Sequence, residues 1–151
     1  MILESLLAWA HIMAFIMLAT FMTAETALCR ADWMNPAVVR RLVRMNALSL
    51  LSALIVLATG AARSFWGMKG AGWYWSQHLL HAKIALLVAM ALLLFMAARR
   101  YRSWRHRLDA GGALPAADEL RKTRMLVMWA AHLMVVVVLL AVFLARGVFT
   151  R

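Results

Sequence analysis

The chain has 151 residues, of which 66% are hydrophobic and 15% charged, and its mean hydropathy is +0.78. Soluble domains are only roughly 45–50% apolar, so the composition excludes a soluble domain and predicts an integral membrane protein. The formal charge of +11 would favour nucleic acid as the partner of a soluble chain. Here the basic residues fall between the apolar segments, where they are typical of topology signals and anionic-lipid contacts, so the expected partner is the lipid bilayer and not nucleic acid.

Four apolar segments have about the length that crosses a bilayer. They run over 6–24, 45–62, 77–98 and 125–145. Hydrocarbon cannot satisfy open backbone groups, so each segment should be an α-helix. The first segment has no basic n-region and no clean cleavage site, and is predicted to be a retained helix. We therefore predict one all-α domain over residues 1–151, an integral membrane four-helix bundle.

The basic residues are unevenly divided between the two sides of such a bundle. The first and third connections carry 12 lysines and arginines, whereas the opposite side carries four. By the positive-inside rule, the two basic connections lie in the cytoplasm and both termini lie on the outer, periplasmic side. The predicted location is the inner (cytoplasmic) membrane of a bacterium, crossed by several passes. Cys29 is the only cysteine, which excludes an intrachain disulfide and a cysteine-based metal site.

The first segment carries a polar stripe. Glu4, His11 and Glu25 are separated by multiples of seven residues, which places them on one helical face. Ionisable groups inside a span usually face the bundle interior and serve a function. His11 is therefore a candidate cofactor ligand or proton-handling group, the alternative being a core histidine bonded to a neighbouring helix. Near the cytoplasmic end, Glu25 is expected to pair with a loop arginine such as Arg30 or Arg44.

The second segment is predicted to serve packing. Asn35 and Pro36 indicate a helix start, with Asn35 as the cap and Pro36 at the first position. Small residues recur on one face and would let a neighbouring helix approach closely; they are Asn46, Ser49, Ala53 and Gly60. The same face allows a homo-oligomer without predicting one. From Gly60 onward, the glycine-rich run to residue 72 predicts an outer loop.

The third segment brings His78, His81 and Lys83 into an apolar helix. Lys83 lies about 200° round the helix from His81, so the two cannot serve one small site together. From the helical rise, His11 lies roughly 9 Å, Lys83 roughly 8 Å and His81 roughly 5 Å below the outer surface. Three candidate ligands thus reach one level, although a lysine near a helix end can also extend to the interface.

In the fourth segment, His132 and Arg146 share a face. Arg146 falls at the level of Glu4, and we predict a structural ion pair between them; an Arg146 that extends to the interface explains the sequence equally well. His132 lies roughly 20 Å from the outer face, too deep to join the other histidines. Its predicted role is structural or that of a proton relay.

Several runs resemble an uncharacterised family of bacterial membrane proteins called domain of unknown function 2214. The longest run spans residues 51–70 and includes Ala-Thr-Gly60-Ala-Ala-Arg63; the others are residues 73–75, 81–83 and 145–147. The resemblance covers nearly the whole chain, and it implies no activity because none is assigned to the family.

His11 and the third-segment run His81-Ala82-Lys83 are also similar, more distantly, to HemJ-type protoporphyrinogen oxidases, and CopD-type copper-resistance proteins look related. The HemJ resemblance implies that His11 and Lys83 are tied to haem b binding and activity. The run after the third-segment motif, residues 94–98, departs from the HemJ pattern. The haem site therefore carries over more readily than the oxidase reaction.

Three functions follow, of which the first is favoured. The first is a haem b protein with a redox role, with His11 as one axial ligand and Lys83 or His81 as the other. Such a membrane oxidoreductase would act on a porphyrin or quinone-like substrate; resemblance favours Lys83, and ligand chemistry alone favours His81. The second is a copper-handling protein, for which 12 methionines and five histidines offer ligands. The third is a structural or accessory subunit without a cofactor.

Overall fold

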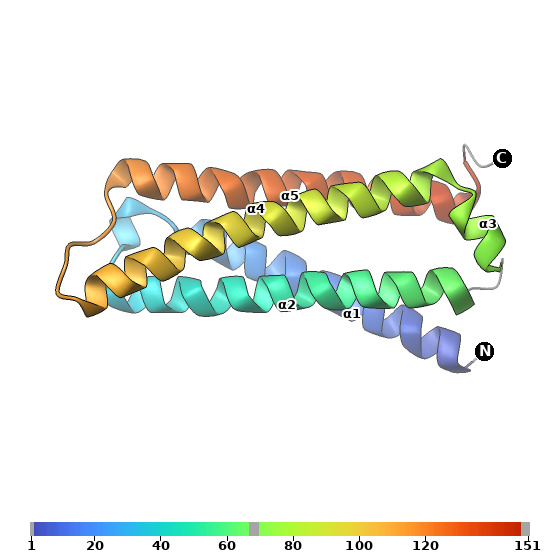
Figure 1. Ribbon diagram of the computed structural model, residues 1–151, viewed down its shortest axis with the longest axis horizontal. Helices are drawn as coiled ribbons and strands as arrows, with labels where there is room; N and C mark the ends of the chain where they lie inside the picture. Colours follow the sequence, from blue (N-terminus) through green and yellow to red (C-terminus); the bar gives the residue numbers. More distant parts are fainter. Residues whose placement is uncertain (1, 67–69, 149–151) are drawn as a thin grey trace.

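The computed structural model describes residues 2–66 and 70–148. They contain four long helices, α1 (Ile2–Leu28), α2 (Pro36–Trp66), α4 (His78–Asp109) and α5 (Ala117–Arg146), as Figure 1 shows. Two short elements, the 3-10 helix η1 (Ala31–Trp33) and the helix α3 (Ala71–Trp75), lie in the connections. Each long helix is long and apolar enough to cross a membrane. The prediction of an all-α bundle of four spans is confirmed.

The four long helices form a ring in which each contacts two neighbours, in the order α1, α2, α4, α5. The contacts between α1 and α2 and between α4 and α5 are the most extensive, and those between α1 and α5 the least. Both chain ends lie at one end of the bundle, which we call the termini end, and there α1 leans away from α5 (Figure 1). The other end, where α4 ends and α5 begins, we call the basic end.

The helices are longer than the apolar segments that predicted them. The loop expected over residues 60–72 is wrong up to Trp66, because α2 continues as helix to that residue, and residues 67–69 of that loop lie outside the described residues. At its other end, α2 begins at Pro36, as predicted, and the Val38 amide donates a hydrogen bond of 3.0 Å to Asn35 Oδ1. A helix satisfies its backbone within itself, so it need not end where the hydrocarbon does.

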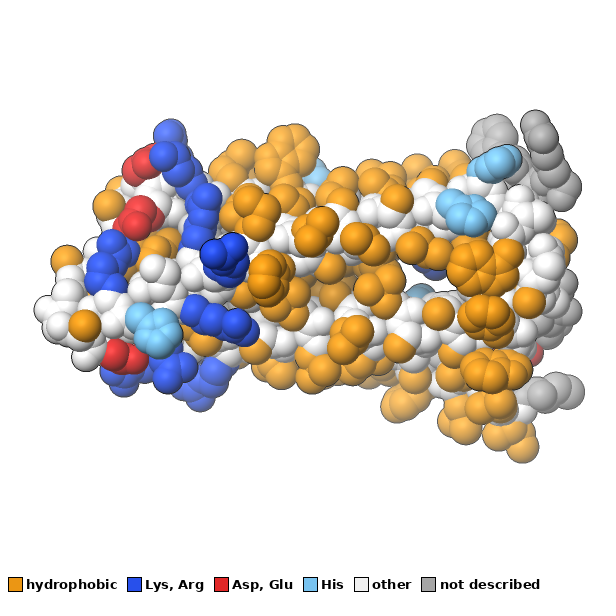
Figure 2. Space-filling model, viewed as in Figure 1, with side chains coloured by type: hydrophobic (Ala, Val, Ile, Leu, Met, Phe, Trp, Pro, Cys, Tyr) orange, Lys and Arg blue, Asp and Glu red, His pale blue; other side chains and the backbone are white. Residues whose placement is uncertain are grey.

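Apolar side chains cover the middle of the bundle, and lysines and arginines gather at the basic end (Figure 2). Residues such as Trp9, Leu54, Leu92 and Val135 are more than half exposed. Helices that expose apolar residues in this way require a lipid surround. At the basic end, Arg107 bonds Glu119 at 2.9 Å and Arg40 reaches Asp109 at 3.4 Å. The side of the membrane on which each end lies remains the prediction of the positive-inside rule.

The hydrophobic core lies in the middle of the bundle and toward the basic end. It contains Leu18 and Met22 of α1, Leu42 of α2, Leu94 of α4 and Val127 of α5, all fully buried. Three further buried residues, Leu80, Val137 and Leu144, lie toward the termini end and outside this cluster. The two halves of the bundle are therefore packed differently.

Candidate functional site

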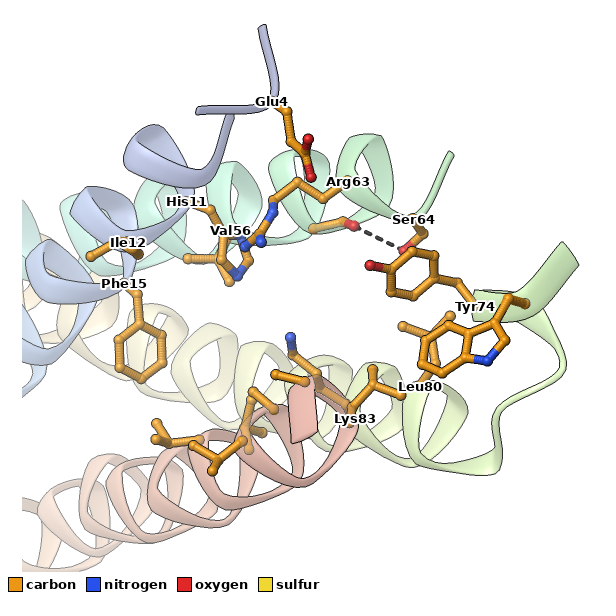
Figure 3. A pocket seen from close by; sticks show the side chains of 18 residues that line it. Glu4, His11, Ile12, Phe15, Val56, Arg63, Ser64, Tyr74, Leu80 and Lys83 are labelled. Carbon is orange, nitrogen blue, oxygen red and sulfur yellow. Dashed lines mark hydrogen bonds between the residues drawn. The ribbon is translucent and has the colours of Figure 1, made fainter. Parts of the chain in front are cut away.

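A pocket of about 550 Å³ occupies the termini half of the bundle. All four long helices line it, together with Trp73 and Tyr74 of α3, and Tyr74 lies at its end (Figure 3). Most of the lining is apolar, and its acidic and basic side chains, apart from the phenol of Tyr74, are Glu4, His11, Arg63 and Lys83. We call it the His11 pocket.

His11 is held on one side by α2. A Cβ placed on Gly60 would lie 3.3 Å from His11 Cε1, so the missing side chain is what lets the ring pack against this helix. His11 Nδ1 lies 2.8 Å from Thr59 Oγ1, and the Thr59 hydroxyl in turn donates to the Ile55 carbonyl at 2.6 Å. Since that hydroxyl has one hydrogen, it accepts from Nδ1–H of the neutral ring. The Nε2 lone pair of His11 is then left available for a ligand.

Lys83 reaches the same pocket from α4. Leu80 and Lys83 line it, and Leu87 on the same face lies in the core. In Figure 3 the Lys83 amine and the His11 ring extend into the pocket from opposite sides. The structure thus brings His11 and Lys83 together, as their equal depth predicted.

His81 does not line this pocket. Its side chain is exposed, and its Nδ1 lies 3.1 Å from the Gln77 carbonyl oxygen of the preceding turn. Its ring also meets the edge of Trp75, with centroids 6.0 Å apart. The angular separation of His81 and Lys83 round the helix places only Lys83 beside His11.

Arg63 is a pocket residue that sequence reasoning missed. The second apolar segment ends at residue 62, so the sequence places Arg63 in the connection that follows. The helix continues, so Arg63 and Ser64 fall on the same face as Val56 and Gly60, and all four line the pocket. The spacing of four, seven and eight residues is the signal that could have found it. The lining carries two basic side chains, Arg63 and Lys83, and one carboxyl group, that of Glu4.

The other predicted residues lie apart. Glu4 lines the His11 pocket, but Arg146 is exposed, and no ion pair between described residues joins the two. The ion pair between Glu4 and Arg146 therefore stays a prediction. His132 is exposed on α5, and its Nδ1 lies 2.7 Å from the Met128 carbonyl oxygen one turn earlier. It lines neither of the two pockets described here, and its relay role stays a prediction.

The expected pairing of Glu25 with a loop arginine is wrong. The Glu25 side chain is fully buried, and its carboxylate accepts hydrogen bonds from Asn46 Nδ2 at 3.0 Å and Ser49 Oγ at 2.5 Å. Asn46 Nδ2 also donates to the Leu94 carbonyl at 3.2 Å, whereas Arg30 bonds Asp32. Position 25 faces α2 because it shares the α1 face of Leu18 and Met22. Asn46 and Ser49, interpreted as packing residues, instead form with Glu25 a polar group that we call the Glu25 cluster.

The His11 pocket opens sideways toward the bilayer. Figure 2 shows the surface hollowed at this end, between α2 and α4. Toward α1 and α5, where the two helices diverge, the lining is formed by Ile12, Phe15, Val138 and Val142.

Metal ligands are sparse in the part of the chain that the structure describes. No group of three or more His, Cys, Asp or Glu side chains in residues 2–66 and 70–148 could hold a metal ion.

The chain matches, over residues 3–149, the model of a family described as "Predicted membrane protein (DUF2214)". It belongs to this family. The match includes every residue that lines the His11 pocket, so the pocket is part of the family's domain. No curated protein and no solved structure matches the chain.

Proposed function

We propose that this membrane protein binds haem b in the His11 pocket and has a redox role. The observation that carries the proposal is the position of His11: its Nδ1 lies 2.8 Å from Thr59 Oγ1, and its ring lines a pocket with apolar walls, an arrangement that would leave Nε2 for a ligand. Histidines that ligate metals usually bond through the other ring nitrogen in this way, which fixes the tautomer and the ring orientation.

The size and chemistry of the pocket fit a haem. Its volume of about 550 Å³ falls within the roughly 300–1,000 Å³ of small-molecule and cofactor sites. Apolar walls suit the macrocycle, and Arg63 toward the termini end suits a carboxylate of the haem edge. Haem iron needs only one or two side-chain ligands, in keeping with a single imidazole.

Lys83 is the proposed partner of His11 across the pocket. It is the group implied by the HemJ resemblance, and its amine faces the same space as the His11 ring. His81, the alternative, would have to leave the exposed face of α4 to reach this space. When bound, haem would supply reversible one-electron chemistry. The chain's own part is to hold it through His11 and Lys83 and to surround it with apolar side chains.

The hollow between α2 and α4 supports a partner that arrives through the bilayer, such as a porphyrinogen or quinone-like molecule. Porphyrinogen oxidation is the reaction that the HemJ resemblance implies. Rescue of a bacterial strain that lacks protoporphyrinogen oxidase tests that reaction. Failure of rescue by a protein that does bind haem would leave an electron carrier in its place.

The binding proposal is tested by visible absorption of the purified protein after expression with added haem precursor. We expect a Soret band in the wild type, its loss in His11→Ala, and its retention in His81→Ala, a matched control outside the pocket. Lys83→Ala should keep a band but shift it, because one ligand changes. A wild type without a band overturns the haem proposal, and metal analysis of the same sample then tests copper. Full haem occupancy in His11→Ala would show that His11 is not the ligand.

A further inference from the structure

A second pocket, of about 240 Å³, lies at the basic end between η1 and the first turns of α5. Arg30 and Asp32 line it from the η1 side, and Arg121 and Arg124 line it from α5. Farther along α5, toward the middle of the bundle, its lining continues with Met125 and Met128. We call it the Arg124 pocket.

Arg124 differs from the other arginines of this pocket. Arg30 reaches Asp32 at 3.5 Å and Arg121 reaches Asp118 at 3.7 Å, both with largely exposed side chains. Arg124 takes part in no ion pair between described residues, and its Nε is buried without a hydrogen-bond partner. A buried donor without a partner is costly, and a ligand oxygen in the pocket would remove that cost.

The charge of the lining residues indicates the sign of the ligand's charge. Arg30 and Arg121 are each paired with a carboxylate, Asp32 and Asp118, so Arg124 leaves the pocket with an excess positive charge that attracts a negatively charged ligand. Guanidinium groups match the oxygens of a phosphate and can bond two of them at once. Met125, which is 44% exposed, gives the pocket an apolar margin on the side of the bilayer.

We propose that the Arg124 pocket binds a phosphate group, with Arg124 as its central contact, and that an anionic phospholipid carries this phosphate. The basic end is where headgroups meet the bundle, and basic pockets between helices bind lipid headgroups in this way. The methionine margin would meet the start of an acyl chain. The site is independent of the His11 pocket, which lies at the opposite end of the bundle.

The test is native mass spectrometry of the whole detergent-solubilised protein titrated with phosphatidylglycerol. We expect the wild type to retain one lipid and Arg124→Gln to bind it about tenfold more weakly, the size of one lost charge-assisted hydrogen bond. Arg102→Gln is the matched control, because Arg102 is an exposed arginine of the same end that does not line the pocket. Arg124→Lys keeps the positive charge but loses the guanidinium group that can bond two phosphate oxygens at once, so this variant should bind the lipid several-fold more weakly.

Helical circular dichroism and thermal unfolding establish that each variant is folded. Equal lipid retention by the wild type and folded Arg124→Gln overturns the proposal, and so does an equal loss in Arg102→Gln, which would indicate only general charge attraction. Inorganic phosphate in large molar excess separates the two sources of phosphate. If it leaves the lipid bound, the lipid is supported as the ligand; if it displaces the lipid, the pocket is a site for free phosphate.

Discussion

The two halves of the bundle place polar side chains inside the membrane in opposite ways. In the basic half, the Glu25 carboxylate bonds Asn46 and Ser49 within a closely packed core. In the termini half, His11 and Lys83 face an open pocket, and His11 Nδ1 lies 2.8 Å from Thr59 Oγ1. The two halves therefore differ in their surroundings: one holds its ionisable side chain in a packed core, and the other holds its ionisable side chains beside a pocket.

Packing gives the largest expected contrast between the halves. Leu94→Ala removes a fully buried side chain of the core and should lower the free energy of unfolding by about 2–5 kcal/mol. Leu144→Ala enlarges a pocket that already exists, so fewer contacts are lost and the cost should be less than half as large. Denaturant unfolding in detergent measures both. Equal losses would contradict the contrast in packing.

The thiol of Cys29 tests how well the basic half excludes water. Its side chain is 1% exposed, and burial raises its pKa to about 11. At pH 8 about a thousandth of it is thiolate, against about a quarter for an exposed cysteine, so alkylation should be about two orders of magnitude slower. The rate should rise about tenfold per pH unit until near pH 11. Maleimide labelling measures it, with denatured protein as the control; a plateau near pH 8.5 would show an exposed thiol.

The Glu25 cluster should contribute to stability and not to haem binding. Glu25→Ala leaves Asn46 and Ser49 without their carboxylate and should cost about 1–3 kcal/mol. Glu25→Gln keeps an oxygen acceptor and should cost less. Thermal unfolding with the Soret band as a second readout measures both roles. Arg30→Ala is the control. If it destabilised the protein as much as Glu25→Ala does, the result would indicate that Glu25 pairs with Arg30.

Gly60→Ala gives the smallest effect and probes the termini half. The new Cβ would lie 3.3 Å from His11 Cε1, so the ring must shift by a few tenths of an ångström. We expect haem to bind several-fold more weakly, with stability changed by no more than about 1 kcal/mol. Haem titration followed by absorption measures the change, and Ala61→Ser on the exposed side of α2 is the control. Unchanged affinity would show that the ring position does not matter.

The sequence predicted the spans because a helix needs a run of about 20 apolar residues to cross the hydrocarbon of a bilayer. It predicted the start of α2 at Pro36 but not its end, because the helix continues past the apolar segment to Trp66. His11 and Lys83 could be matched because depth follows from helical rise alone. The Glu25 cluster could not be predicted in this way. A spacing of seven residues shows that Glu4, His11 and Glu25 share one face of α1, but it does not show that this face turns toward Asn46 and Ser49 at Glu25. Arg63 was not predicted as a pocket residue because the second apolar segment ends at residue 62, four residues before the end of α2 at Trp66.

The haem content per chain of the wild-type protein, purified after expression with added haem precursor, tests the central claim most directly. Quantified as extracted haem against protein, it should approach one haem b per chain in the wild type and fall to background in His11→Ala. A wild-type protein that is folded and helical but carries no haem would contradict the account.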